Sequence, residues 1–523
     1  MQATLNDKKV SAEDLAKLHK EISVSEFFLK NRHLLGFDNP KKALLTTIKE
    51  AVDNSLDAAE EAKVLPVIHV KTDAVSDSRF KVIIEDNGPG IIKSLVPRVF
   101  GKLLFGSKFH RLKCSRGQQG IGISSAAMYG QLTTGKPIKI WSKIASKNTA
   151  YYFELFIDTK TNEPQVLKEE EVEWPEKKHG IKIEIILEAK YSKGKQSVDD
   201  YLKQIAIVNP HSRIVYHSPD SSVIEFPAVS KLLPKEPKEI KPHPYGVELG
   251  ILMKMLKETK ARTLSGFLQT DFCRVSPKVA KEICDKAKLY INARPSRIAV
   301  QEVNALYKAI QETKIMSPPT DCLVPIGQEV LLKGLKKEID AEFYTAVTRP
   351  PSVYRGNPFQ IEAAIIYGGS LEADKLAKIY RFANRVPLLY QQSACASYHA
   401  VLNTGWRNYG ISQSKGALPS GPLAIVIHMS SVWVPFTSEA KEAIASYPEI
   451  IKEMKLALQE CGRKLGTYLR GKRRKEHEAK KKSYIEKYLP HIGIGLGEIL
   501  NLKEKEREKV LEILKDVLER SRQ

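Results

Sequence analysis

A row of polar side chains follows Asn39 and Pro40, and these side chains have the types and spacing that chemistry requires. Glu50, Asn54 and Asp57 are separated by four and three residues, so on a helix they share one face. A carboxylate such as that of Glu50 can activate water, and the amide oxygen of Asn54 can bind Mg²⁺. Taken alone, the pattern is more typical of a solvated helix face, so it needs support from elsewhere in the chain.

A second candidate lies where an apolar run, residues 80–85, ends in a turn of sequence DNGPG. Asp86 stands at the end of this predicted strand, where its carboxylate can accept a hydrogen bond from an exocyclic amine. Gly88 and Gly90 tolerate positive φ and let a ligand approach the backbone. Considered by itself, the segment is better explained as an ordinary hairpin turn.

The third candidate is a glycine pattern, G-x-x-G-x-G, formed by Gly117, Gly120 and Gly122. It directly precedes a helix-forming run at 124–129, so backbone amides and the positive end of a helix favour a phosphate in front of them. The preceding segment, residues 100–116, is rich in polar groups, and we expect it to be a flap that closes over a nucleotide.

Two other glycine motifs are rejected. Residues 130–137 nearly match a P-loop, but Pro137 replaces the Ser or Thr that would bind Mg²⁺, and the segment joins a helix to a strand rather than a strand to a helix. Residues 117–122 are not a dinucleotide-binding motif, because no strand-to-helix unit contains them.

These three candidates need a helix, a strand and a second helix to position them. Asn39 is a good N-cap and Pro40 a good first residue, so a helix is predicted to begin there. Its predicted buried stripe is Leu44, Ile48, Val52, Leu56 and Ala59. Strand-like runs at 80–85, 137–141 and 180–187 alternate with helical ones, which indicates an α+β layer domain.

The rest of the chain divides by composition. A lysine- and proline-rich linker is expected at 231–246, a small helical insert at 247–313, and a second α/β domain after residue 319. After Pro448, apolar residues recur at spacings of three and four, which predicts one seam on a long helix. The seam residues are Ile451, Met454, Leu458, Cys461, Leu465 and Tyr468.

Composition limits the class of protein. The 523 residues include six cysteines without a CxxC pair, so a disulfide scaffold and a zinc ribbon are excluded and reduced thiols are expected. No signal peptide or membrane span is predicted, because no long apolar run occurs. The net charge of +22 favours nucleic acid over a membrane as partner.

The positive charge is concentrated in two places. Residues 241–318 hold 14 Lys and Arg against 7 Asp and Glu, a net +7, and residues 470–482 hold 8 against 2, a net +6. We therefore expect the insert and the distal helix to contact DNA phosphates. The sequence WRNY at 406–409 is another possible DNA contact, although a buried Trp406 is the favoured interpretation.

The order of the three boxes, E-x-x-x-N-x-x-D, then D-x-G-x-G, then G-x-x-G-x-G, resembles the nucleotide-binding site of the GHKL ATPases, which include gyrase, MutL, ninety-kilodalton heat-shock chaperones and histidine kinases. This resemblance implies a Bergerat-fold ATPase domain. Glu50 occupies the general-base position that the histidine kinases lack.

Further segments resemble the B subunits of archaeal topoisomerase VI, among them SVSEFFLKN, FGKLLFGSKF, KPHPYG, NPFQIEAAIIYGG and WVPFTSEAKEAI. The resemblance implies an α+β multidomain protein. Its expected parts are an N-terminal extension at 1–22, a GHKL ATPase domain at 23–240, a helix-two-turn-helix domain at 241–318, an α/β transducer domain ending in a long helix at 319–488, and a C-terminal region at 489–523 that contacts the A subunit.

Carried over to this chain, the resemblance implies that Glu50 is the catalytic base, Asn54 the Mg²⁺ ligand and Asp86 the adenine-binding residue. Lys441 corresponds to a switch lysine that reaches the γ-phosphate of ATP and takes part in catalysis. The remaining expected nucleotide-binding residues are Asp57, Gly88, Gly90, Ser107, Lys108, Gly117, Gln118, Gln119, Gly120, Ile121, Gly122, Ile123 and Ser124.

The implied function is that of the ATP-hydrolysing subunit of a type IIB DNA topoisomerase in the archaeal cytoplasm, associated with the nucleoid. ATP and Mg²⁺ are its expected cofactors. Its expected partners are double-stranded DNA, a DNA-cleaving A subunit in an A2B2 heterotetramer, and a second B subunit joined by ATP-dependent dimerisation that gates duplex passage.

Two alternatives remain at this point. One is a stand-alone MutL-like or chaperone-like ATPase, from which the helical insert distinguishes this chain. The other is a nucleotide-locked DNA clamp, which the presence of Glu50 and Lys441 argues against.

Overall fold

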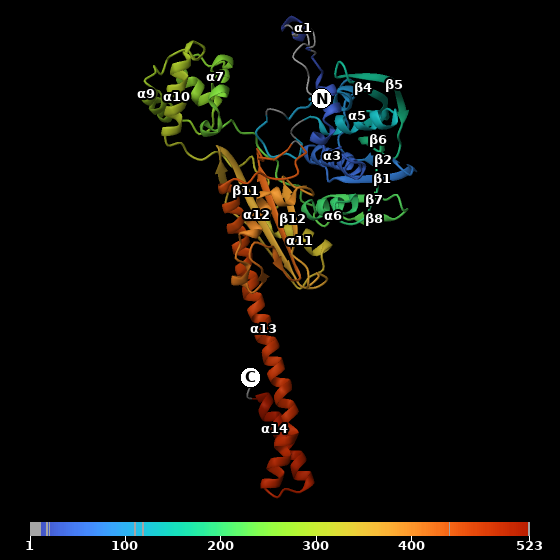
Figure 1. Ribbon diagram of the computed structural model, residues 1–523, viewed down its shortest axis with the longest axis vertical. Helices are drawn as coiled ribbons and strands as arrows, with labels where there is room; N and C mark the ends of the chain where they lie inside the picture. Colours follow the sequence, from blue (N-terminus) through green and yellow to red (C-terminus); the bar gives the residue numbers. More distant parts are fainter. Residues whose placement is uncertain are drawn as a thin grey trace, which may run out of the picture.

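The computed structural model describes residues 12–16, 19, 21–108, 111–117, 120–438 and 440–520. Figure 1 shows two sheet domains side by side, a small helical module beside them, and a long helix that extends away from the second sheet domain. Helix α1 (Ala12–Ala16) lies near the N-terminus, outside the sheet domains (Figure 1). Within the described residues, no helix is long and apolar enough to span a membrane.

The first domain has a mixed sheet in the order β5-β4-β3-β6-β2-β1-β7-β8. Its strands are β1 (Val67–Ser76), β2 (Arg79–Glu85), β3 (Ile138–Lys143), β4 (Thr149–Asp158), β5 (Glu163–Glu173), β6 (Gly180–Glu188), β7 (Arg213–His217) and β8 (Val223–Phe226). Its helices are α2 (Val24–Lys30), α3 (Pro40–Glu61), α4 (Val96–Gly101), α5 (Gly122–Thr134) and α6 (Val198–Val208), with 3-10 turns at Arg32–Leu35 and Lys93–Leu95.

Helix α3 begins where the sequence predicts. The side chain of Asn39 accepts a hydrogen bond of 2.9 Å from the backbone N–H of Lys42, and Pro40 is the first helical residue. The predicted stripe from Leu44 to Ala59 is buried against the sheet, which confirms that face of the helix. The opposite face is therefore left to carry Glu50 and Asn54 toward a pocket.

The helical module follows the linker and has its own apolar core. It consists of α7 (Leu249–Glu258), α8 (Leu264–Asp271), α9 (Pro277–Ala287) and α10 (Val300–Glu312), with 3-10 turns at Pro244–Gly246 and Pro295–Arg297. The Ser276 side chain caps α9 by accepting a hydrogen bond from the Val279 N–H. Pro277 is the first helical residue, a position where the missing N–H of proline costs no helical hydrogen bond. The predicted helical insert is thus confirmed.

The second sheet domain has strands in the order β10-β11-β16-β12-β13, with β9 also paired to β11. Its elements are α11 (Gln328–Glu338), β9 (Phe343–Thr348), β10 (Ser352–Tyr354), β11 (Asn357–Tyr367), β12 (Lys378–Ala383), β13 (Val386–Pro387), α12 (Ala396–Leu402), β14 (Ser412–Gln413), β15 (Pro419–Ser420) and β16 (Leu423–Ser431), with 3-10 turns at Gln392–Ala394 and Trp406–Tyr409. Trp406 is fully buried, which confirms the favoured interpretation of the WRNY segment.

Helix α13 (Pro448–Ile499) packs its predicted seam on this sheet, and α14 (Glu504–Arg520) folds back along its distal end (Figure 1). Gly462 is needed in the seam, because a Cβ there would lie 2.6 Å from the ring of Tyr409. The boundary expected between residues 488 and 489 lies inside α13, and the chain turns only after Ile499.

Candidate ATP site

A cavity of about 520 Å³ lies between the two sheet domains. Most of the predicted site residues line it: Glu50, Asn54, Asp86, Gly90, Ser107, Lys108, Gly117, Gly120, Ile121, Gly122, Ile123 and Lys441. Asp57, Gly88 and Ser124 lie next to the cavity without lining it, and Gln118 and Gln119 lie outside the described residues. The three sequence boxes and the predicted Lys441 of the second sheet domain thus meet at one place.

Asp86 is buried at the end of β2. Its carboxylate accepts hydrogen bonds from the Ser55 hydroxyl (2.7 Å) and the backbone N–H groups of Gly88 (2.8 Å) and Ile181 (3.1 Å). Burial raises the pKa of Asp86, and these hydrogen bonds oppose the rise. Gly90 is required here, because its φ is +74° and a Cβ would lie 2.2 Å from the carbonyl oxygen of Lys143. The DNGPG turn is therefore organised by hydrogen bonds to the Asp86 carboxylate and is not an ordinary hairpin turn.

Glu50 meets the start of α5, where the glycine pattern ends. A Cβ on Gly122 would lie 1.8 Å from Oε2 of Glu50, so a larger residue would displace the Glu50 carboxylate from this position. Helix α5 begins at Gly122, two residues before the predicted run. The hydroxyl of Ser124 donates to the Ile121 carbonyl oxygen at 3.2 Å, so it serves the first helical turn.

Asp57 lies under the glycine segment and is held by two cations. Its Oδ2 accepts from Lys108 Nζ at 2.7 Å, and its Oδ1 accepts from Arg116 Nη1 at 2.8 Å. Burial alone would raise the pKa of Asp57, but Lys108 and Arg116 outweigh it and hold the pKa below its usual value. Asp57 therefore anchors the residues that surround the cavity, and the sequence alone does not indicate these partners.

Lys441 comes from the second sheet domain and lies in a turn with a φ of 53°. Its Nζ donates to the carbonyl oxygen of Arg116 at 3.1 Å. Burial lowers the pKa of Lys441, and the charge of Glu50 opposes this shift. The next residue, Glu442, forms an ion pair of 2.5 Å with Lys42 near the start of α3. The Lys441 turn is thus attached to the start of α3 and to the segment before the glycines.

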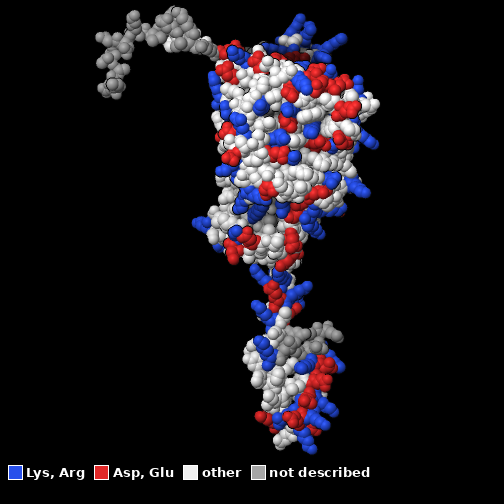
Figure 2. Space-filling view, turned by 90° about the vertical axis from the view of Figure 1, so that its right-hand side faces the viewer, with Lys and Arg blue, Asp and Glu red and all other residues white. Residues whose placement is uncertain are grey.

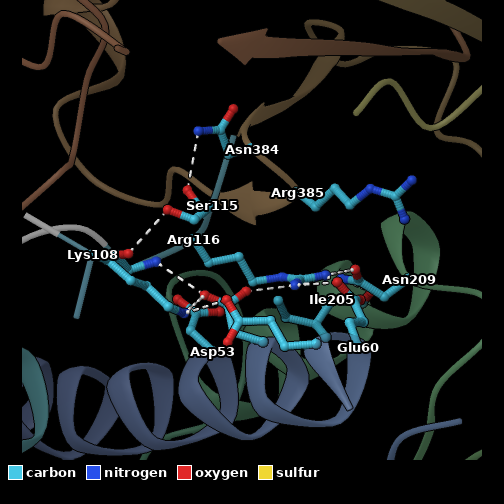
Figure 3. A network of polar contacts seen from close by, with 12 residues as sticks. Asp53, Glu60, Lys108, Ser115, Arg116, Ile205, Asn209, Asn384 and Arg385 are labelled. Atoms are coloured by element: carbon cyan, nitrogen blue, oxygen red, sulfur yellow. Dashed lines mark hydrogen bonds and ion pairs between the residues drawn. The ribbon is translucent and has the colours of Figure 1, made fainter. Parts of the chain in front are cut away.

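Sequence reasoning missed four residues that hold this site together: Ser55, Lys42, Arg116 and Asn384. Arg116 is the most connected of them, and Figure 3 shows its guanidinium running between α3 and Asn209. Its position directly before the glycine pattern is the one signal that could have identified it. Among the described residues, no cluster of His, Cys, Asp and Glu forms a metal site.

Two family models match the chain. Residues 39–160 match the family described as histidine kinase-, DNA gyrase B- and HSP90-like ATPase, which defines the first sheet domain as a GHKL ATPase domain that binds ATP. Residues 318–482 match the topoisomerase VI B subunit transducer, which covers the second sheet domain and part of α13. The class is therefore a GHKL ATPase joined to a transducer domain.

Whole-chain relatives identify the family within this class. The chain is 48% identical over 490 residues to the B subunit of type 2 DNA topoisomerase 6 from Methanococcoides burtonii, covering 94% of this chain and 79% of the relative. It is 47% identical over 496 residues to the protein of the same name from Archaeoglobus fulgidus, covering 94% and 82%. The chain belongs to the topoisomerase VI B-subunit family. It is the ATP-hydrolysing subunit of a type II DNA topoisomerase, whose partner is the A subunit.

Among solved structures, the ATPase region of Saccharomyces cerevisiae topoisomerase II bound to ICRF-187 has a TM-score of 0.42 and 10% identity, covering 87% of this chain and 98% of that chain. The sequence relatives confirm the predicted family and enzyme class. The same relatives favour a topoisomerase subunit over both alternatives, the stand-alone ATPase and the nucleotide-locked clamp.

Proposed function

We propose that this cavity binds ATP with Mg²⁺, that Glu50 is the general base and that Lys441 holds the γ-phosphate. The supporting observation is that Glu50 of α3, Gly122 at the start of α5 and Lys441 of the transducer domain line one cavity. A carboxylate, a helix N-terminus and a partly buried ammonium are the groups that bind a γ-phosphate and activate water beside it.

The adenine end is assigned to the carboxylate of Asp86. Ser55 fixes Oδ2 of Asp86, while two backbone N–H groups fix Oδ1, so the carboxylate is rigid before a base arrives. A preorganised acceptor loses little entropy when it accepts a hydrogen bond from an exocyclic amine. Adenine recognition is separate in this proposal from the phosphate end, which is assigned to Ser107, Lys108, Gly117 and residues 120–124.

Asn54 fits the expected Mg²⁺ ligand. Its side chain lines the cavity one helical turn after Glu50. An amide oxygen is a hard donor that suits Mg²⁺, which supplies charge neutralisation at the phosphates when it is bound. Asn54 would then orient the phosphate chain while Glu50, one helical turn earlier, faces the attacking water.

Hydrolysis requires Glu50 to take a proton from water as the water attacks the γ-phosphate. Lys441 stabilises the charge on the phosphate and loses its anionic partner when the phosphate leaves. Because Lys441 belongs to the transducer domain, the loss of the γ-phosphate changes a contact of the transducer domain rather than of the domain that binds adenine. We infer that ATP joins two B chains into a gate and that hydrolysis reopens it.

We further propose that residues 241–318 form a helix-two-turn-helix domain and contact DNA together with residues 470–482. Ser23 to Ile240 form the ATPase domain and 319–488 the transducer domain in this proposal, after an N-terminal extension at 1–22. Lys and Arg stand out around the narrow shaft of α13, beside some acidic residues (Figure 2). A DNA affinity that falls steeply with salt supports these contacts, and a flat dependence rejects them.

Residues 489–523 are proposed to contact the DNA-cleaving A subunit in an A2B2 heterotetramer. This distal region exposes apolar side chains, among them Ile499 at 79% and Ile513 at 60%. Exposed apolar side chains at the distal end of α13 and on α14 are typical of a surface that binds another protein. The assembly would relax and decatenate DNA at the nucleoid in the cytoplasm, and relaxation of supercoiled DNA only with both subunits and ATP tests it.

The assignment of the site is tested by ATP turnover of three single variants. Glu50→Ala should lower turnover by at least about 100-fold, because the general base is lost. Lys441→Ala should lower it by about 10- to 100-fold while nucleotide binding is largely retained. Glu225→Ala, on the exposed edge strand β8, is the matched control and should leave turnover unchanged. Normal turnover in Glu50→Ala or Lys441→Ala removes that residue from the site.

A further inference from the structure

Arg116 is an arginine with 4% of its side chain exposed, and it joins three elements of the ATPase domain. Nη1 donates to Asp57 Oδ1 and to Glu60 Oε2, each at 2.8 Å. Nη2 donates to Glu60 Oε1 at 2.7 Å and to Asn209 Oδ1 at 2.5 Å. Figure 3 shows these contacts running parallel to α3. One planar side chain thus ties the end of α6 and the segment before the glycines to α3.

The charge balance around Arg116 keeps this contact ionised. Burial alone would lower the pKa of Arg116 and raise that of Glu60, but their mutual attraction reverses both shifts. Glu60 is also hydrogen-bonded to Nε2 of His211 at 2.8 Å. The carboxylate is therefore held from two sides, and the guanidinium has a fixed position.

The backbone of the same segment is where the transducer domain contacts the ATPase domain. Asn384 Nδ2 donates to the Ser115 carbonyl oxygen at 3.1 Å, and Lys441 Nζ donates to the Arg116 carbonyl oxygen at 3.1 Å. Asn384 is itself fixed, because it exchanges two hydrogen bonds of 2.9 Å with the backbone of Ser431 at the end of β16. The peptide at 115–116 is thus held by the transducer, and its side chain by α3.

We propose that Arg116 is a positioning residue that sets the distance between the glycine segment, α3 and Lys441, and so makes the site prefer ATP over ADP. Gly117 follows Arg116 directly, and its N–H points to Asp57 Oδ2 at 3.4 Å. A shift of Arg116 moves both the phosphate-binding backbone and the carbonyl oxygen that Lys441 contacts. The inference rests on the proposed roles of this cavity and of Lys441.

Lysine cannot replace arginine here. A guanidinium presents donors in a fixed plane and binds Asp57, Glu60 and Asn209 at once, whereas an ammonium is a single point of charge. Arg116→Lys therefore preserves the charge and removes the geometry. The adenine end should be spared, because the hydrogen bonds that fix Asp86 come from Ser55, Gly88 and Ile181 and not from Arg116.

The test compares Arg116→Lys and Asn384→Ala with wild type in the full chain, with Mg²⁺ present. Affinities for a non-hydrolysable ATP analogue and for ADP are measured separately, together with turnover and thermal unfolding. Loss of one or two charge-assisted hydrogen bonds should lower the ratio of analogue affinity to ADP affinity by about tenfold in Arg116→Lys. Asn384→Ala should lower it in the same direction by a smaller factor.

The matched control is Arg213→Lys, since Arg213 pairs with Glu225 at 2.8 Å on the exposed β7–β8 hairpin. This variant should keep the wild-type ratio. Lys441→Ala should add little to the loss of ratio in Arg116→Lys, because both act on the same contact. The ratio is a readout that a merely structural role would leave unchanged.

Equal weakening of both nucleotides, or a ratio equal to that of wild type, would overturn the inference. If Arg116→Lys does not fold, the ratio of analogue affinity to ADP affinity measured in Asn384→Ala decides the question. If Glu50→Ala and Lys441→Ala retain turnover, the proposed site itself fails. If those two lose turnover while Arg116→Lys and Asn384→Ala keep the wild-type ratio, only the role of Arg116 fails.

Discussion

Two glutamates in polar networks, one in each sheet domain, invite comparison: the Glu362 side chain is fully buried, and that of Glu60 is 18% exposed. Glu60 at the end of α3 is held by Arg116 and His211. Glu362 on β11 is held by the N–H groups of Ile326 (2.6 Å) and Gly327 (2.8 Å), the Thr348 hydroxyl (2.7 Å) and His428 (2.9 Å). Both carboxylates have a depressed pKa despite burial, and that of Glu362 falls to about 2 because His428 and backbone N–H groups bind it.

The partners differ in kind. Nε2 of His428 accepts a hydrogen bond of 3.0 Å from the backbone N–H of Arg385, so the ring proton is on Nδ1. The neutral ring therefore donates from Nδ1 to Glu362. Glu362 is thus fixed by dipoles that belong to the transducer core. Glu60 is fixed by a full charge on the segment that leads into the phosphate-binding glycines. The first arrangement stabilises a fold, and the second attaches a functional segment to it.

The largest effect is expected for Glu362→Ala. It leaves the His428 ring N–H, two backbone N–H groups and a hydroxyl without their acceptor, which should cost about 3–5 kcal/mol of unfolding free energy. Chemical denaturation measures the loss. The preference for ATP over ADP should stay at the wild-type value in the folded protein, and a changed preference would break the distinction between the two glutamates.

A somewhat smaller loss of stability is expected for Glu60→Gln. The new amide cannot form an ion pair with Arg116, although Arg116 retains its hydrogen bonds to Asp57 and Asn209. The free energy of unfolding should therefore fall by about 3 kcal/mol. Unlike Glu362→Ala, this variant should also lower the ratio of ATP-analogue affinity to ADP affinity. Competition binding measures the ratio, and a loss of stability without any change in ratio would make the two glutamates equivalent.

Asp53 sharpens the comparison because it is a buried carboxylate of α3 with a neutral partner, the Tyr201 hydroxyl at 3.0 Å. Burial raises the pKa of Asp53 to about 7, so its contribution to stability is present below pH ~4 and is lost as the pH rises through about 7. Asp53→Asn mimics the neutral acid. Its stability relative to wild type should be greater at pH 8 than at pH 5 by about 2–3 kcal/mol.

That difference is measured by urea unfolding of both proteins at the two pH values. Groups that the two proteins share cancel in the comparison, so only residue 53 and its immediate couplings contribute. An equal stability difference at pH 5 and pH 8 would show that Asp53 titrates alike in the folded and unfolded chain.

The smallest effect is expected for Arg213→Ala, which removes an exposed ion pair with Glu225 on the same domain. Solvent and salt screen such a pair, so the unfolding temperature and the nucleotide preference should both stay at wild-type values. Differential scanning calorimetry provides the check. A clear destabilisation here would mean that burial is not what separates Glu60 and Glu362 from surface carboxylates.

Much of the fold follows from local patterns. The start of α3 depends on Asn39 and Pro40, and the seam of α13 depends on apolar residues three and four apart. These signals act within one or two turns of chain, so the sequence carries them without reference to the rest of the molecule. The glycine pattern is likewise local, whereas the approach of Glu50 to Gly122 at the start of α5 joins two distant segments.

The sequence by itself determined the elements of this protein, the order of its nucleotide-binding boxes and the family it resembles. Only the tertiary structure decided which groups meet: Arg116 binds Glu60 across 56 residues, and Lys441 reaches the Arg116 carbonyl oxygen across 325. The physical reason is that local preferences fix dihedral angles and faces, whereas contacts between distant segments depend on how two domains pack and on which buried charges must find partners.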